Sequence, residues 1–164
     1  MNRAACKTLV ERAHCKIVQE YITVLINSSL RCASNNWYQI SDKIIQDSNQ
    51  LQQFFAEQQS SAAWLDKAIQ DVAEIIKIND IDALKIEVAA FVTSYPDVRK
   101  EHISAILDVK GKISKTDRRS ILKQVDYMME LNDNLLSCNK LFQGINVSKI
   151  QWRKNGCCIL CCIV

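Results

Sequence analysis

The chain has 164 residues with a formal net charge of +3, and 48% of them are hydrophobic, but it has only three glycines and one proline. This length fits one domain with a substantial core. The scarcity of turn-forming residues excludes a sheet-rich fold, which needs a turn at roughly every tenth residue. We therefore expect an all-α domain over residues 1–150, an antiparallel bundle of about six helices.

The first two predicted helices cover residues 4–27 and a stretch from about residues 37–41 to residue 58. In the second, Leu51 and Phe55 are expected to point inward. In the first, apolar residues recur at three- and four-residue spacing, which is the period of one helix face. We expect that face to lie against the core: Val10, Ala13, Ile17, Tyr21 and Leu25.

The next two helices have clearer boundaries. Ser60 or Ser61 is positioned to cap the third helix, whose apolar face comprises Leu65, Ala68, Ile69, Val72, Ile75 and Ile76. The fourth helix has a core face made of Ile81, Leu84, Val88, Phe91 and Tyr95. It is predicted to end at Pro96, because proline has no backbone N–H and disfavours helix at the preceding residue.

Two shorter helices follow. Asp97 is a candidate cap for the fifth, and Gly111 is placed to end it with a positive φ. The segment Ser114–Asp117 resembles a capping box that starts the sixth. We expect residues 135–150 to return to the bundle, and these two helices to bury Ile103, Ile106, Leu107, Ile121, Leu122, Val125, Met128 and Met129.

The last residues carry four cysteines behind a short basic run. Cys161-Cys162-Ile163-Val164 has the C-a-a-X frame for prenylation, with Cys161 as the thiol. Cys157 and Cys158 would then be candidates for palmitate, a second anchor that makes membrane binding stable. We predict a flexible Cys-rich tail at 151–164 that meets an anionic membrane surface through Lys149, Trp152, Arg153 and Lys154.

Other readings of this tail stay open. An unmodified apolar tail would need no chemistry. Alternatively, Cys158 and Cys161 form a C-x-x-C pair, and a thiol or metal-dependent protein would act through Cys157, Cys158, Cys161 and Cys162. Structural zinc needs four ligands on a folded scaffold, and no histidine or second separated cysteine pair follows. The remaining cysteines, expected to be reduced and at least partly buried, are Cys6, Cys15, Cys32 and Cys138.

Charge is distributed unevenly along the chain. Residues 1–38 carry five basic and two acidic groups, residues 39–97 four and ten, and residues 98–164 twelve and six. The three segments are therefore +3, −6 and +6. A basic end of this kind favours a membrane or an acidic protein as partner over nucleic acid, because no aromatic-interleaved basic strand is present to stack bases.

The residues around Pro96 resemble a known family. Tyr95-Pro96-Asp97 is followed by Glu101-His102 and an apolar helix that ends at Lys110-Gly111. This pattern resembles the last helical part of the exocyst complex component 3 and tumour necrosis factor alpha-induced protein 2 family. The resemblance is strongest over residues 90–145. The motif residues are Tyr95, Pro96, Asp97, His102 and Gly111.

The resemblance implies a non-enzymatic, peripheral protein of exocytosis. Family members are rods of stacked helical bundles that tether secretory vesicles and contact SNARE proteins and other exocyst subunits, and they are several times longer than this chain. The chain is thus expected to be a C-terminal fragment or a truncated paralogue, at the end of such a rod. Its expected location is the cytoplasm, peripherally at the plasma membrane or vesicle membranes.

Enzyme chemistry finds little support in the sequence. His14 and Cys15 are adjacent, so on a helix their side chains diverge by about 100 degrees and cannot act on each other. His102 is expected to cap or pack within the motif. The chain lacks a phosphate-cradling glycine loop. We therefore expect no cofactor, no metal and no small-molecule substrate.

Overall fold

A computed structural model describes residues 3–28, 37–132 and 140–148 of the chain. The predicted tail at 151–164 and the end of the predicted domain near residue 150 lie outside these residues. The described part contains six α-helices and one 3-10 turn and no strand, which confirms the all-α prediction. The elements are α1 (Arg3–Asn27), α2 (Trp37–Glu57), α3 (Trp64–Lys77), α4 (Ile81–Ser94), α5 (Lys100–Lys110), α6 (Lys115–Asn132) and η1 (Phe142–Gly144).

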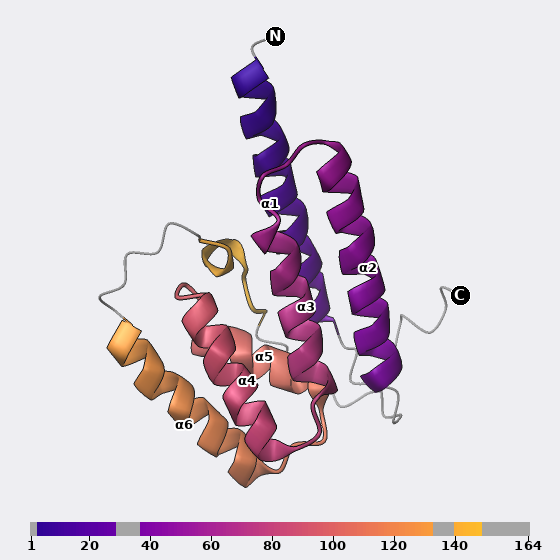
Figure 1. The fold of residues 1–164 in the computed structure, drawn as a ribbon. Coiled ribbons are helices and arrows are strands. Elements are labelled where there is room, and N and C mark those ends of the chain that lie inside the picture. The colour runs from indigo at the N-terminus through magenta and orange to yellow at the C-terminus, as the bar shows by residue number, and fades with distance from the viewer. Residues whose placement is uncertain (1–2, 29–36, 133–139, 149–164) are drawn as a thin grey trace.

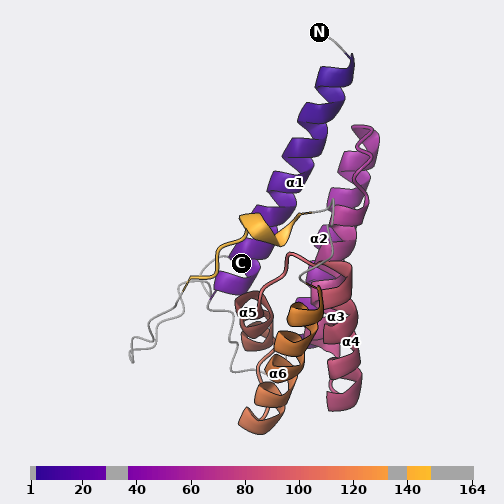
Figure 2. The ribbon, with the colours of Figure 1, turned by 90° about the vertical axis from the view of Figure 1, so that its left-hand side faces the viewer.

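The helices form a bundle in which α1 to α4 alternate in direction (Figure 1). Helix α2 packs along α3, and α4 packs along α6. Helix α5 lies across the others and contacts α1, α3 and α6. The first turns of α1 extend beyond the bundle, as Figures 1 and 2 both show.

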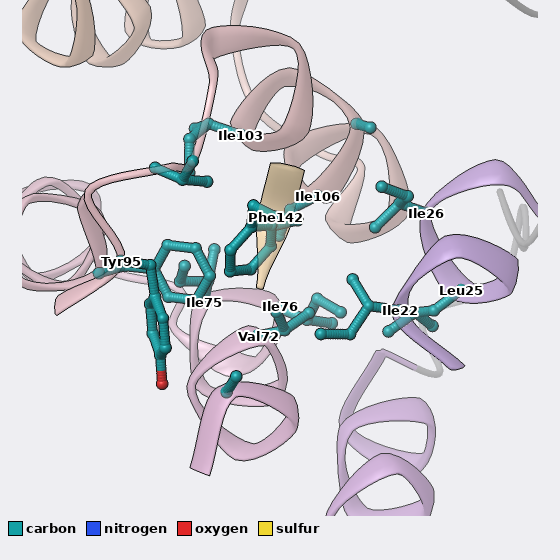
Figure 3. Close-up of a cluster of buried hydrophobic side chains, with 14 of the residues drawn as sticks. Ile22, Leu25, Ile26, Val72, Ile75, Ile76, Tyr95, Ile103, Ile106 and Phe142 are labelled. Carbon is teal, nitrogen blue, oxygen red and sulfur yellow. The ribbon is translucent and has the colours of Figure 1, made fainter. Parts of the chain in front are cut away.

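The core forms around α3, the most amphipathic element of the fold. All six of its predicted inward residues are buried, as are the predicted core residues of α4 from Leu84 to Tyr95. Side chains from α1 and α5 complete the cluster, and Phe142 of η1 projects into it beside Tyr95 (Figure 3). Residues 140–148 thus return to the bundle, within the range 135–150 for which this was predicted.

The predicted core face of α1 is correct at Leu25, which is buried, and at Tyr21, which packs against the core, but it is wrong at Ala13 and Ile17. Ile17 is 42% exposed and Ala13 is also exposed, whereas His14, Val18 and Ile22 are buried. Apolar residues occur all round this helix, so three- and four-residue spacing fits two faces equally well. The bundle selects the face that contains His14, because that histidine finds polar partners in the interior.

Several helix ends follow the sequence. The Asp80 carboxylate accepts a hydrogen bond from the Ala83 amide at the start of α4. Gly111 ends α5 with φ 64°, a conformation that glycine adopts without steric cost. Ser114 caps α6 by accepting from the Asp117 amide. The ends at Gly111 and Ser114 are those that the sequence predicts.

Two predicted caps are wrong. The cap residue of α5 is Arg99 rather than Asp97. The cap residue of α3 is Ala63, and it makes no side-chain cap hydrogen bond. Ser60 and Ser61 lie four and three residues before the first residue of α3, where their hydroxyls bond to α1 instead.

The turn between α2 and α3 holds a residue in the left-handed region. Gln59 has φ 59°. The Ser60 amide donates to the Phe55 carbonyl and the Gln59 amide to the Ala56 carbonyl, which is the hydrogen-bond pattern of a Schellman motif. Glycine normally occupies this position, and a residue with a Cβ costs about 1 kcal/mol there.

A buried lysine closes the opposite end of α3. The Lys110 ammonium donates to the Ile76 carbonyl at 3.0 Å and also to the Ile78 carbonyl. Both carbonyls belong to the last turn of α3 and its continuation, where the helix leaves acceptors unpaired. Burial lowers the pKa of Lys110 to about 8, so most of the side chain is still charged at neutral pH.

Candidate functional site

The motif residues surround the segment 140–148, which we call the strap. Tyr95 ends α4 and is 5% exposed. Its ring packs on Phe91 and on Phe142 of the strap, with centroid distances of 4.8 and 5.5 Å. Its hydroxyl donates to Asp71 of α3 at 2.8 Å, and burial together with this carboxylate raises the pKa of Tyr95. Tyr95 therefore holds α4, α3 and the strap together.

His102 joins the start of α5 to the strap. Its Nδ1 accepts from the Arg99 amide at 3.0 Å, so Nε2 carries the proton and donates to the Ile145 carbonyl at 2.9 Å. Both ring nitrogens are thus satisfied in the neutral form. Burial lowers the pKa of His102 despite the Ile145 hydrogen bond, and the Arg99 guanidinium lowers it further. The predicted capping role of His102 is confirmed.

Three apolar side chains anchor the strap. Leu141, Phe142 and Ile145 are all fully buried. Phe142 lies 5.4 Å from both the Phe91 and His102 rings, measured between centroids. Burying each such side chain contributes about 1.5–3 kcal/mol. The strap is thus held by an apolar row on one side of an otherwise exposed segment.

Polar side chains bind the main chain at the first half of the strap. The side-chain amide of Gln19 donates to the Leu141 carbonyl at 2.9 Å. The Asp97 carboxylate accepts from the Gln143 amide at 2.9 Å. Gly144 passes so close to α1 that a Cβ on it would lie 2.5 Å from the Gln19 amide nitrogen. A side chain at position 144 would therefore displace the end of the Gln19 side chain, which donates to the Leu141 carbonyl.

Further contacts fix the second half. The Arg99 guanidinium donates to the Ile145 carbonyl at 3.0 Å, beside the donor from His102. The Asn27 side chain binds twice, donating to the Asn146 carbonyl at 2.8 Å and accepting from the Ser148 amide at 2.7 Å. We call the contacting residues the strap site: Gln19, Asn27, Tyr95, Asp97, Arg99 and His102.

The structure brings most of the motif together. Tyr95, Asp97 and His102 meet around the strap, and Pro96 forms the turn between the first two. Gly111 lies at the far end of α5, about 16 Å along the helix axis. The predicted lipid-attachment and membrane-surface residues all lie outside the described residues: Cys157, Cys158, Cys161, Lys149, Trp152, Arg153 and Lys154.

A second polar cluster joins α1 to the start of α3. The His14 ring stacks on Phe55 with centroids 3.8 Å apart. In the neutral form with its proton on Nε2, His14 donates to Asp66 at 3.0 Å and accepts from the Ser60 hydroxyl at 2.9 Å. The order of residues is that of a serine–histidine–carboxylate relay. His14 and Asp66 are each 1% exposed, so the cluster fastens helices rather than meeting substrate.

Sequence reasoning missed this cluster and the strap site. His14 lies 46 residues before Ser60 and 52 before Asp66, and the sequence analysis considered it only with nearby cysteines. The available signal was the place of His14 four residues before Val18 on one helix face.

Cys6 is exposed, contrary to expectation, while Cys15 is half-buried, and burial and nearby Asp97 raise the pKa of its thiol.

The described residues contain neither a membrane-spanning helix nor a cluster of metal-ligating side chains. None of these helices is long and apolar enough to span a bilayer. In the same part of the chain, no three histidine, cysteine or acidic side chains gather as metal ligands would.

Comparison with known proteins identifies the family. The sequence model of the exocyst complex component Sec6 family matches residues 1–115, which is well over half of the chain. The chain belongs to the Sec6 family. This confirms the resemblance drawn from Tyr95 to Gly111.

Individual members of the Sec6 family are similar over most of this chain. Tumor necrosis factor alpha-induced protein 2 of Mus musculus is 38% identical over 119 residues, covering 72% of this chain and 17% of that protein. The exocyst complex component 3-like protein of Danio rerio is 28% identical over 135 residues, or 76% of this chain and 17% of that protein. The chain thus spans about a sixth of the length of these relatives.

A solved structure shares the fold. The crystal structure of M-Sec superposes with a TM-score of 0.71 and 31% sequence identity, covering 87% of this chain and 23% of that chain. The helical arrangement described here is therefore that of one part of a longer Sec6-family protein.

Proposed function

We propose that the chain is a non-enzymatic tethering module of exocytosis that binds exocyst subunits and SNARE proteins and forms the end of a helical rod. The match of residues 1–115 to the Sec6 family carries this proposal. The fold supports it, because the buried polar side chains His14, Asp66 and His102 bond to one another or to main chain inside the bundle. An adaptor needs such a rigid scaffold and requires no cofactor.

The module would lie peripherally at the cytosolic face of the plasma membrane or of vesicles. Lys115, Arg119 and Lys123 are exposed on successive turns of α6. Each basic side chain contributes about 1 kcal/mol next to an anionic leaflet. Together with the basic run and the C-a-a-X frame of the tail, they form two signals for membrane binding, which is the number that stable anchoring needs.

Capture of exocyst subunits tests the tethering role. The full chain, tagged at its N-terminus so that Cys161 stays free, is expected to recover exocyst subunits from animal cells. A Leu84→Asp variant, which places a charge in the core, should lose them. Recovery of no exocyst subunit by the folded wild-type chain would contradict the proposal.

Membrane fractionation tests the tail. We expect Cys161→Ser to move the chain into the soluble fraction and to remove the prenyl mass from the intact protein. Cys6→Ser, at an exposed cysteine outside the frame, is the matched control and should change neither. Unchanged membrane association of Cys161→Ser would count against prenylation.

Vesicle binding tests the basic face of α6. Reversing Lys115, Arg119 and Lys123 to glutamate should weaken sedimentation with phosphatidylserine vesicles, and the effect should shrink in high salt. Equal weakening by a control set would refute a specific role for α6. The control set reverses three lysines that already form i,i+4 ion pairs: Lys16, Lys43 and Lys67.

A further inference from the structure

The strap is recognised mainly through its main chain. Six hydrogen bonds join side chains of the strap site to the strap, and all six end on main-chain carbonyl oxygens or amide nitrogens of the strap. Such contacts fix an extended path without reading the side chains along it. Sequence is read only where the apolar anchors Leu141, Phe142 and Ile145 enter the core.

The strap is also separable from the helices that hold it. Apart from bonds within η1, the one main-chain hydrogen bond of the strap to another main-chain group among the described residues is also internal, from the Ile145 amide to the Phe142 carbonyl. The strap therefore shares no helix ladder with the bundle. Every residue of the strap site lies within residues 1–115, the stretch matched by the Sec6 family, and the strap follows that stretch.

We propose that the strap site is a docking site for an extended segment of another protein, for which the strap is an internal competitor. The segment would carry two adjacent apolar residues, the second aromatic, followed three residues later by a β-branched aliphatic one. This is the spacing of Leu141, Phe142 and Ile145. The inference stands on the contacts of the strap and does not require the tethering role.

The polar contacts define the rest of the ligand. Arg99 and His102 both donate to one acceptor, so the ligand must place a carbonyl oxygen where Ile145 now places one. Asn27 donates and accepts, so the ligand must place a carbonyl and an amide just beyond that position. The Asp97 carboxylate uses only one oxygen, because its Oδ1 is buried without a hydrogen-bond partner. A ligand with a second donor beside the position of Gln143 satisfies Asp97 better than the strap does.

Internal competition makes the affinity of the site depend on the strap. A ligand binds only the fraction of molecules whose site is open. Its apparent dissociation constant is therefore the intrinsic dissociation constant divided by that fraction. Emptying the site by substitution in the strap should therefore tighten binding of the same ligand.

Peptide binding to the full chain tests the proposal. The probe is a fluorescent peptide of residues 140–148, followed by anisotropy. We expect the double variant Phe142→Ala, Ile145→Ser to bind it saturably and at least tenfold more tightly than the wild-type chain. A probe with alanine at the phenylalanine position, and Asp97→Ala added to the double variant, should each abolish binding. Failure of the double variant to bind, or equal binding of both probes, would overturn the proposal.

Hydrogen exchange on the wild-type chain gives a test that needs no variant. The amides of Gln143, Ile145 and Ser148 should exchange through a local opening, much faster than those at the centre of α3. Equal protection of strap and core would overturn the proposal. Measurement of the mass of the wild-type chain in solution separates the source of the ligand, since a dimer with exchanged straps would assign the site to a second copy instead.

Discussion

Replacement of Phe142 by alanine tests whether the strap can detach from the bundle or is a fixed part of the core. Phe142 is fully buried, and truncation of such a phenylalanine within a rigid core costs about 3–5 kcal/mol. Phe91 of α4 offers a matched control, because it is 2% exposed and its ring lies 5.4 Å from that of Phe142. Phe91 cannot leave the core without unfolding α4, so Phe91→Ala should cost the full amount.

The stability lost when Phe142 is replaced by alanine cannot exceed the net free energy with which the strap docks on the bundle. Three buried side chains contribute about 1.5–3 kcal/mol each and six hydrogen bonds about 1 kcal/mol each. Ordering nine residues costs about 1–2 kcal/mol for each of them. The two sides balance near 13 kcal/mol to within a few kcal/mol. Once one anchor is lost, the strap detaches and the remaining bundle loses nothing more.

We therefore expect Phe142→Ala to lower the free energy of unfolding by about 1–2 kcal/mol, well below the cost of Phe91→Ala. Urea titration followed by helical circular dichroism measures both. With a slope of about 1–3 kcal/mol per molar urea, the two midpoints should differ by roughly 1 M. Equal or larger destabilisation by Phe142→Ala would show that the strap unfolds with the bundle, and the reasoning would fail.

Three smaller effects follow from single residues. His102 has a lowered pKa in the fold, so the unfolded chain binds more protons below about pH 6.5 and stability falls there; the melting temperature of wild type should drop more between pH 7.5 and 5.5 than that of His102→Asn. Gln59→Gly should raise the melting temperature by about 2–4 °C by relieving the left-handed conformation, whereas Gln58→Gly should lower it. Ser114→Ala should cost about 1 kcal/mol in urea titrations through loss of the α6 cap, and Thr116→Ala nearly nothing.

Each of these effects has a contradicting result. Parallel pH profiles of wild type and His102→Asn would mean that His102 does not titrate differently on folding. A loss of stability in Gln59→Gly would mean that the glutamine side chain contributes more than its backbone strain costs. Equal effects of Ser114→Ala and Thr116→Ala would remove the cap as the cause.

Much of the fold could be predicted because local rules decide it. The face of α3 repeats with helical spacing over more than three turns, and Pro96 and Gly111 stop helices for reasons of backbone geometry alone. The predicted ends of α1 and α2 agree with the structure to within one residue where single end residues were given. In each case a single segment contains all the information that the prediction needs.

The strap site and the face of α1 depend on residues far apart in the chain. Asp97 was expected to cap α5, but its carboxylate binds the amide of Gln143, 46 residues later. His14 lies inside because Asp66 and Ser60 are there to pair with it, and no periodicity reveals that pairing. The sequence motif thus located the right residues around Tyr95 and His102, and the structure supplied their shared contact.

The double contact of Asn27 determines how a pull on the C-terminal end of the chain would enter the fold. Ser148 is bound to Asn27 near the end of α1, and the chain continues from that point. Tension on it would break the Ser148 and Asn146 bonds to Asn27 first and then the remaining strap contacts one after another, before any helix unfolds. The nine residues released would lengthen a tether by about 30 Å. The domain can therefore yield under modest force while its helical body remains intact.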